Sequence, residues 1–441
     1  EWSLSARTTV LKLPAGDMRM SIGAEFRTED GEVDVGPVAL AGDSGGLAPQ
    51  GTKGTQRVQE TFFEADIPLA ENLFLVDQLS VNISGRYTSY NTFGGRYLSR
   101  YAVSYGPFKD LRLRGVYSTS FRSPSISDLF LGPADSFVSV SDPCDGFPNI
   151  NPVLLAGCQR ELDRSGAGPF DEDNPFGGFG NQSRQVRSNI GGNQQLSEET
   201  ADNVTLGFVY TPSFMSGANL AVDYYDIEVD NPVVGQSPQF RVNNCVVRNQ
   251  QNECDAQQRD ANGNLIFVDV PRTNFGQFRT RGLDFSAVYI KTMPFVGPTR
   301  FGFEGVYTYD FTVKTFNGKT DVVGLIGGAS GGLPRMKGFF DIQMNPTEEL
   351  TIETSVEYLG GNTNFSQRAA DFPFDKIRPV MYVDAGIRYR ITDRVAFTLS
   401  AQNLFNKRPP LVIGDSTFTN TNTSLYDPIR RRYFATISAE F

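Results

Sequence analysis

The sequence contains no histidine, one tryptophan and four cysteines among its 441 residues. The lack of histidine removes the commonest general base and the commonest metal ligand from any active site. The sequence also lacks a phosphate-binding loop, and its two Gly-x-Ser-x-Gly segments, residues 42–46 and 328–332, have no histidine to serve as the base of a catalytic serine. Glu353 and Glu357 on one strand would lie about 13 Å apart, which is too far for the carboxylate pair of a glycosidase. We therefore predict that the protein is not an enzyme and holds no cofactor.

Long hydrophobic runs are absent as well. No stretch approaches the roughly 18 uninterrupted apolar residues that a transmembrane helix needs. A chain of this kind can cross a membrane only as strands, which need about 10 residues each with alternate positions apolar. The mean hydropathy of −0.29 is compatible with such strands, because lumen-facing positions and loops are polar. The net charge of −10 disfavours nucleic acid as a partner, since phosphate binding needs clustered lysine and arginine.

The four cysteines fall into two local pairs, Cys144 with Cys158 and Cys245 with Cys254. Both pairs lie in polar segments rich in Asn, Asp, Pro and Gly, which predicts two loop disulfides formed in an oxidising compartment. Four free thiols or a metal site are the alternatives, but neither pair contains a Cys-x-x-Cys unit. The acidic run at residues 171–173 matches no calcium loop. We therefore predict no metal site.

Fifteen segments show the two-residue alternation of β-strands, and no segment has a convincing amphipathic helix pattern. We therefore predict an all-β fold. In residues 299–314, aromatic side chains recur on one face, namely Phe301, Phe303, Tyr307, Tyr309 and Phe311. The predicted strands are residues 2–12, 18–28, 55–67, 79–90, 96–105, 111–120, 199–210, 220–229, 275–290, 299–314, 335–345, 350–358, 381–391, 395–403 and 433–441.

The lengths of the connections alternate along the chain. A short turn follows every odd strand, and a loop, usually a long one, follows every even strand; only residues 91–95 make a short loop. This asymmetry is typical of bacterial outer-membrane barrels, with short periplasmic turns and long extracellular loops. Neither a β-sandwich nor a β-propeller requires short and long connections to alternate along the chain. The pattern predicts a transmembrane, antiparallel, up-and-down β-barrel.

The number of predicted strands is odd, whereas single-chain bacterial barrels have even numbers. Glu1 already lies in a predicted strand and is not preceded by a methionine or a signal sequence. We therefore expect the chain to be the C-terminal part of a barrel of about 22 strands, with the first strands absent.

The last nine residues alternate between apolar and mostly polar positions. In a soluble protein this would be a sheet that happens to end on a strand. The segment resembles the closing strand of outer-membrane barrels, so we predict it to be the signal that the barrel assembly machinery reads. The residues on its apolar face are Phe441, Ala439, Ile437, Ala435 and Tyr433.

Four further segments resemble TonB-dependent outer-membrane receptors. Residues 118–125, Ser-Thr-Ser-Phe-Arg-Ser-Pro-Ser, are similar to the family's Gly-Phe-Arg-Ala-Pro-Ser stretch, with Ser120 in place of Gly and Ser123 in place of Ala. Residues 196–200 are similar to its Leu-x-Pro-Glu segment, with Glu198 where Pro is common. The other two similar segments are residues 281–284, Arg-Gly-Leu-Asp, and 403–408, Asn-Leu-Phe-Asn-Lys-Arg.

The resemblance implies active uptake of a scarce solute, such as a siderophore, a carbohydrate or another nutrient. It implies location in the outer membrane, contact with its lipid, and energy from the TonB–ExbB–ExbD complex. The family's plug domain and TonB-contacting box are not in this chain, so these expectations concern the complete protein. A passive porin-like channel and a surface barrel that binds a partner protein are the alternatives.

Two sets of residues are candidates for the ligand site. Arg122 follows the top of a predicted strand, where it either faces the ligand or braces the loop base through a carboxylate such as Asp128; we favour bracing. Residues 121–198 form the longest loop and contain a run rich in Gly, Phe and Asn. Three phenylalanines of this run are candidates to stack on a sugar or aromatic ligand, with packing inside the loop as the alternative: Phe170, Phe176 and Phe179.

Overall fold

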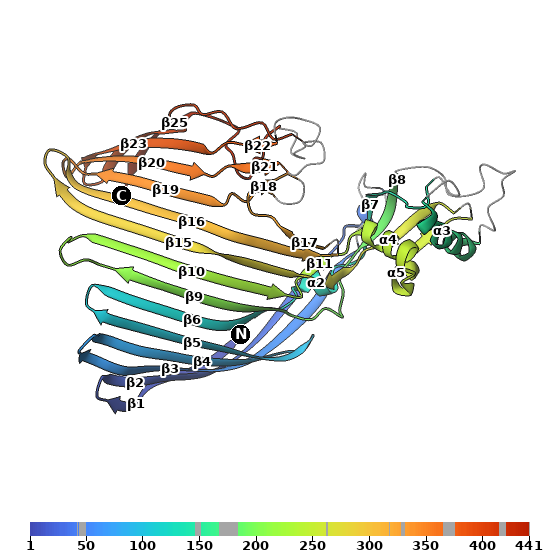
Figure 1. Cartoon of the computed structure of the whole chain (residues 1–441), viewed down its shortest axis with the longest axis horizontal. Helices are drawn as coiled ribbons and strands as arrows, with labels where there is room; N and C mark the ends of the chain where they lie inside the picture. The colour runs from blue at the N-terminus through green and yellow to red at the C-terminus, as the bar shows by residue number, and fades with distance from the viewer. Residues whose placement is uncertain are drawn as a thin grey trace.

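The computed structural model describes residues 1–41, 43, 50–145, 151–166, 184–261, 263–316, 318–327, 331–364, 375–413 and 420–440. A large curved antiparallel sheet dominates the chain, and a smaller unit of helices and short strands extends from one end of it (Figure 1).

The sheet follows the chain from one edge to the other. Fifteen strands form a continuous path from β1 to β25, and β17 (Gly318–Asp321) pairs with β16 beside that path. The predicted number of strands is confirmed. In spatial order they are β1 (Trp2–Leu13), β2 (Gly16–Val33), β3 (Thr52–Leu73), β4 (Val76–Tyr90), β5 (Gly94–Phe108), β6 (Leu111–Arg122), β9 (Glu199–Tyr210), β10 (Ala218–Asp230), β15 (Gln277–Met293), β16 (Gly297–Thr315), β19 (Met336–Met344), β20 (Leu350–Leu359), β23 (Val380–Thr392), β24 (Val395–Gln402) and β25 (Arg432–Ala439).

The predicted difference between the two ends of the sheet is also confirmed. Short turns such as those between β1 and β2 and between β23 and β24 gather at one end, and the long connections gather at the other (Figure 1). We call these the turn end and the loop end. In a membrane barrel they correspond to the periplasmic and extracellular sides.

The connections at the loop end contain the remaining elements. Among the described residues these are α1 (Pro37–Leu40), α2 (Ile126–Phe130), β7 (Ala134–Val140), α3 (Pro152–Ser165), β8 (Arg184–Ile190), β11 (Val233–Gly235), α4 (Pro238–Arg248), α5 (Gln251–Asp255), β12 (Gln257–Arg259), β13 (Leu265–Asp269), β14 (Arg272–Asn274), β18 (Leu325–Ile326), β21 (Asn362–Asn364) and β22 (Lys376–Ile377). No helix in this part of the chain is both long enough and apolar enough to span a membrane.

The expectation that the chain has no amphipathic helix is wrong for α3 and α4. Asn151 caps α3 through its side chain, Pro152 occupies the first turn, and Gly166 ends the helix in the left-handed conformation. Ser237 and Pro238 begin α4 in the same way, and Asn249 ends it. These are ordinary start and stop signals. They escape a search for periodicity because the helices contain only 14 and 11 residues.

The strand registers place apolar side chains beside one another on one face of the sheet. Phe303 lies opposite Phe340 on β19 and Ala287 on β15, and Ala287 lies opposite Leu220 on β10. The neighbouring positions on the other face are polar, as where Glu304 pairs with Ser286. A continuous apolar face suits lipid, and the opposite face suits a wet lumen.

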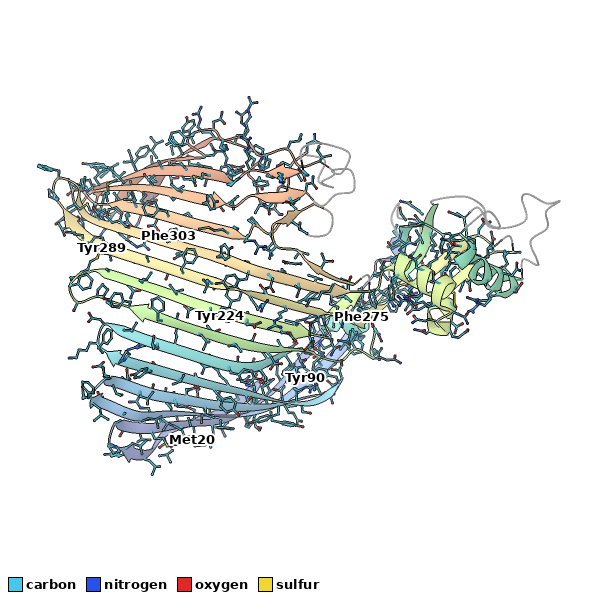
Figure 2. All side chains as sticks on the ribbon, in the orientation of Figure 1. Met20, Tyr90, Tyr224, Phe275, Tyr289 and Phe303 are labelled. Carbon is cyan, nitrogen blue, oxygen red and sulfur yellow. A yellow bond between two sulfur atoms is a disulfide. The ribbon has the colours of Figure 1, made fainter. Side chains whose placement is uncertain are left out.

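The apolar face ends toward the loops in tyrosines. Tyr224, Tyr307 and Tyr309 lie close together there, with ring centroids of Tyr307 and Tyr309 5.5 Å apart. Figure 2 shows Tyr289 and Phe303 nearer the turn end and Tyr224 nearer the loops. The seven residues from Phe301 to Tyr307 span roughly 20 Å of strand. This length agrees with the band of about 25 Å that outer-membrane barrels present to lipid.

Ion pairs begin directly beyond this tyrosine border. Arg281 contacts Asp310 with 3.0 Å between Nε and Oδ2, and Arg279 contacts Asp226 with 2.8 Å between Nη2 and Oδ2. Exposed charges of this kind are costly in hydrocarbon and stable in water or at a headgroup surface. The tyrosines and the ion pairs together therefore mark the outer boundary of the lipid-facing band.

A β-bulge changes the face of one predicted aromatic. Gly282 pairs with Thr308 and Arg281 pairs with Asp310, so Tyr309 is an extra residue on β16. The alternation of β16 shifts there. Phe311 consequently lies opposite Thr280, with its ring 6.5 Å from that of Phe278. The expectation that Phe311 shares the face of Phe301 is wrong, because a bulge leaves no mark in the sequence alternation.

A cation placed on the apolar face should destabilise the protein. We expect Phe303→Arg to lower the free energy of unfolding by about 2–4 kcal/mol, because Phe303 lies near the middle of the lipid-facing band. Urea titration of the intact protein in lipid vesicles measures the effect. Ser286→Arg, on the polar face of the neighbouring strand, is the matched control and should change stability far less. Equal losses in the two variants would contradict the assignment of the faces.

Candidate functional site

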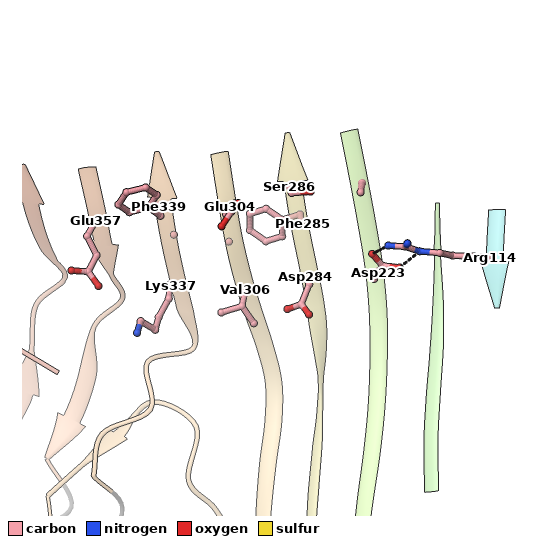
Figure 3. A pocket seen from close by; sticks show the side chains of 13 residues that line it. Arg114, Asp223, Asp284, Phe285, Ser286, Glu304, Val306, Lys337, Phe339 and Glu357 are labelled. Carbon is pink, nitrogen blue, oxygen red and sulfur yellow. Dashed lines mark hydrogen bonds and ion pairs between the residues drawn. The ribbon is translucent and has the colours of Figure 1, made fainter. Parts of the chain in front are cut away.

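A cavity of about 540 Å³ lies against the polar face of the sheet (Figure 3). Its charged side chains come from six strands, and four are carboxylates against two cations. The surface therefore attracts positively charged groups. These side chains are Arg114 on β6, Asp223 on β10, Asp284 on β15, Glu304 on β16, Lys337 on β19 and Glu357 on β20.

One ion pair in this wall crosses an intervening strand. Arg114 and Asp223 both lie opposite Gly207 of β9, one on each side. Gly207 leaves no room for a Cβ atom beneath the Asp223 carboxylate. The guanidinium therefore reaches over β9, and its Nε donates to Asp223 Oδ1 at 2.7 Å (Figure 3). The glycine thus permits an ion pair between strands that are not neighbours.

Arg122 lies at the loop end of β6 and braces the base of the longest loop. Its Nη1 lies 3.3 Å from Asp128 Oδ2, and its Nη2 contacts Glu199. Asp128 also pairs with Arg272 at 3.1 Å. The structure thus places Arg122 against the carboxylate expected from the sequence, whereas a role in binding ligand stays a prediction.

The short helix α2 fixes the same loop onto the neighbouring strands. Ser125 caps the helix by accepting a hydrogen bond from the Asp128 N–H, and the Asp128 carboxylate accepts one from the Ser125 N–H at 3.0 Å. Phe130 lies directly over Gly54 of β3, where no Cβ fits. Burial raises the pKa of Asp128, but the Ser125 hydrogen bonds and the two arginines outweigh burial and hold that pKa below its usual value.

Two long connections fold together into one unit, which we call the loop domain and define as β7, α3, β8, α4, α5, β12 and β13. The first three elements belong to the connection from β6 to β9, and the others to the connection from β10 to β15. Their strands form a four-stranded sheet in the order β12–β13–β8–β7, in which β13 and β8 are parallel. Neither connection can form this sheet alone.

The loop domain has its own core and two disulfides. Buried valines from β7, β8, β13 and α4 pack together beneath the sheet. Cys144 is bonded to Cys158 and Cys245 to Cys254, as the sequence analysis expects. Leu162 and Val246 pack against the first disulfide. Small units with little core commonly depend on such crosslinks.

Buried charges also join the two connections. Glu161 of α3 is 2% exposed, and its carboxylate accepts a hydrogen bond from Gln257 Nε2 at 2.8 Å. Arg259 lies 3.5 Å from Glu161 and donates to Asp142 at 3.0 Å. A buried carboxylate is tolerated only with such partners. Removing one partner would therefore leave a buried charge unpaired and weaken the contact between α3 and β12.

An aromatic stack attaches the loop domain to the sheet. Phe275, just before β15, stacks on Phe316, just after β16, with centroids 3.8 Å apart and planes at 13°. Phe240 of α4 contacts the same ring at 4.3 Å. Two rings that flank β15 and β16 and one ring from α4 thus form the joint.

No suitable set of metal ligands occurs in the described part of the chain. Glu161, Cys245 and Cys254 are the one group of acidic and cysteine side chains close enough together. The two sulfur atoms are bonded to each other, so they are not thiolate ligands.

The remaining predicted residues fall on the last strand or outside the described ranges. Tyr433, Ile437 and Ala439 lie on β25, where Tyr433 pairs with Ala401 and Ile437 with Phe397. Their role in assembly stays a prediction. The sequence-predicted residues that lie outside the described ranges are Phe170, Phe176, Phe179 and Phe441.

The family described as TonB dependent receptor-like, beta-barrel matches residues 2–404. The chain belongs to the TonB-dependent receptor family. The resemblance seen in the sequence is thereby confirmed. A comparison with curated protein sequences finds no match.

Solved structures show the same fold. The ferric enterobactin receptor of Pseudomonas aeruginosa, in complex with enterobactin, is 14% identical, with a TM-score of 0.63 over 100% of this chain and 54% of the receptor. The siderophore receptor PirA of Acinetobacter baumannii is 12% identical, with a TM-score of 0.60 over 100% of this chain and 54% of PirA. The FrpB iron transporter of Neisseria meningitidis is 11% identical, with a TM-score of 0.53 over 96% and 52%. The chain thus spans about half the length of these TonB-dependent receptors and transporters.

The contact between α3 and α4 should not tolerate a methyl group. Gly157 of α3 lies against the Val246 carbonyl, with no room for a Cβ atom. We expect Gly157→Ala to destabilise the loop domain by about 1–3 kcal/mol, the usual cost of overpacking. The rate of proteolysis of the loop domain measures the effect. Gly235→Ala is the control, because its Cβ would point into open space; equal rates in both variants would contradict the contact.

The brace around Asp128 should depend on pH. Because its folded pKa is lowered, its stabilising contribution is fully present above the ordinary pKa of about 3.9 and disappears as pH falls through the folded value. We therefore expect Asp128→Asn to speed proteolysis at the loop base at pH 7, and the difference from the unmodified protein to vanish near pH 2.

The control for this prediction is Glu32→Gln, which removes an exposed partner of Lys53 on neighbouring strands. Exposed pairs contribute little, so this variant should behave like the unmodified protein at both pH values. A difference for Asp128→Asn that persists at the lowest pH would show that the carboxylate charge is not what holds the loop.

Proposed function

We propose that the protein is an outer-membrane active transporter that takes up a scarce solute with energy delivered through TonB, ExbB and ExbD. Membership of the TonB-dependent receptor family is the observation that carries the proposal. Binding of a small molecule at the loop end and its passage along the polar face of the sheet are then two steps of one uptake pathway. The solute class stays open at this level: siderophore, carbohydrate or another nutrient.

The loop end has the construction that a receptor needs. The loop domain is held by two disulfides, a valine core and buried ion pairs. Much of the conformational entropy of its loops is therefore lost on folding, before any ligand binds. Ligand binding to such a preorganised surface loses less entropy than binding to a free loop. These contacts support a role in capture rather than a purely protective one.

We also propose that a plug domain and further wall strands outside this chain complete the transporter. The chain spans about half, 54%, of the length of the enterobactin receptor and of PirA. The cavity on the polar face carries four carboxylates against two cations, which suits a plug surface that presents lysine or arginine. TonB would act on that plug, and the assembly machinery would insert the barrel among outer-membrane lipids.

Two other functions predict different behaviour. A passive porin-like channel would admit solutes whether or not TonB is present. A surface barrel that binds a partner protein would carry no solute at all. No catalytic role is proposed, since the family and its structural neighbours are receptors and transporters.

Uptake should require energy coupling. We expect a strain that expresses the complete protein to accumulate its solute at least tenfold faster with an intact TonB than without it, because only TonB delivers the proton-motive energy to the plug. Accumulation of labelled candidate iron complexes and oligosaccharides measures this, with a protonophore as a second control. Equal uptake in both strains would favour the passive channel, and no uptake in either would favour the surface barrel.

A further inference from the structure

The small sheet of the loop domain has two faces of different chemistry. The valines of β7, β8 and β13 point into the core beneath the helices. Along β8, Val186 and Ser188 are buried, whereas Arg187 is exposed. The registers place Asp135 opposite Asn189 and Phe267 opposite Arg187, which puts these four side chains together on the other face.

A cavity of about 740 Å³ lies against that open face. Phe267, Arg187, Asp135 and Asn189 form one wall, and Gln50 belongs to the connection between β2 and β3 opposite them. The volume lies within the range of about 300–1,000 Å³ that small-molecule sites occupy.

The two walls of this cavity are fixed to each other. The Gln50 N–H donates to the Pro133 carbonyl at 3.3 Å. Gly132 lies so close to the carbonyls of Gln50 and Gly51 that a Cβ atom would not fit. The Gly132 N–H in turn lies 3.4 Å from the Thr52 hydroxyl. The cavity is therefore preformed by backbone contacts between two separate connections.

The polar groups in the wall are planar and held in place. Arg187 Nε donates to Asp135 Oδ1 at 2.9 Å, and the guanidinium lies over the Phe267 ring, 5.7 Å from its centroid. The Arg187 side chain is still 57% exposed, so it keeps donors for a ligand. The amides of Asn189 and Gln50 add both donors and acceptors.

The charges select the kind of ligand. The single arginine in the wall is already neutralised by the single aspartate, so the described lining has no net charge. The chain as a whole carries −10, which further disfavours an anion. A flat apolar ring beside fixed planar donors and acceptors matches a ligand with apolar C–H faces and rows of neutral hydroxyl groups.

We propose that this cavity is a binding site for a neutral oligosaccharide, with a sugar ring packing on the part of the Phe267 ring that Arg187 leaves uncovered, and Arg187, Asp135 and Asn189 binding its hydroxyl groups. At this site the transporter proposed above captures its solute. Only the steps after binding rest on that proposed function. Capture at the loop domain precedes passage along the acidic wall, at a different place in the molecule.

The test is calorimetric titration of the full-length protein in detergent with neutral trisaccharides: maltotriose, cellotriose, xylotriose and mannotriose. At least one should bind to the unmodified protein, and Phe267→Ala and Asp135→Asn should each weaken that binding tenfold or more. Val153→Ala is the matched control, because Val153 is 75% exposed on α3 and does not line the cavity; it should bind normally. Protease resistance of the loop domain confirms that each variant is folded.

Arg187→Lys separates recognition of hydroxyl groups from attraction by charge. Lysine keeps the positive charge but lacks the planar fork of donors, so trisaccharide binding should fall at least fivefold. Trigalacturonate, inorganic phosphate and ferric enterobactin are the anionic probes. Tight binding of an anionic probe that survives Arg187→Lys, in place of trisaccharide binding, would overturn the proposal.

Two further results would also overturn the proposal: no trisaccharide binds, or binding is unchanged in Phe267→Ala and Asp135→Asn. Different outcomes contradict the binding site and the transport function. TonB-dependent uptake without trisaccharide binding contradicts this site alone, whereas trisaccharide binding without TonB-dependent uptake contradicts the transport function alone.

Discussion

Strand register is the constraint on which the rest of the structure depends. Every strand of the wall must pair so that its apolar positions meet those of its neighbours, because a shift of one residue would turn them all to the other face. The rows through Phe303 and Glu304 show how far this agreement extends across neighbouring strands. With the register fixed, the backbone of each inner strand is paired on both sides within the sheet, one face suits hydrocarbon and the other suits water.

The fixed wall also explains how polar side chains are brought together in two places, the cavity on the polar face and the loop domain. The cavity beside Asp223 and Asp284 uses side chains from strands far apart in the sequence, brought together by pairing alone. The loop domain uses the same principle outside the wall. Its buried ion pairs and disulfides hold Arg187 and Phe267 on a small sheet that no single connection could form. The sheet thus carries a second unit with its own core at the loop end.

Much of this fold follows from the sequence alone, because alternation and connection length report directly on strands. The brace between Arg122 and Asp128 is also predictable, since the two residues lie six positions apart around a helix cap. The bulge at Tyr309 is not, because it depends on how β15 meets β16. The cavity at Phe267 is not predictable either: its partner Arg187 lies 80 residues away, and no local pattern announces that two loops pair in parallel.

The parallel pairing of β8 with β13 sets an order of events during biogenesis. β8 precedes β9 in the chain, whereas β13 follows β10, so the hairpin of β9 and β10 separates the two partners. β8 therefore cannot pair with β13 until the chain has passed through this hairpin and β13 has formed. Completion of the loop domain thus needs both connections, whereas each disulfide closes within a single connection and can form before the two connections meet.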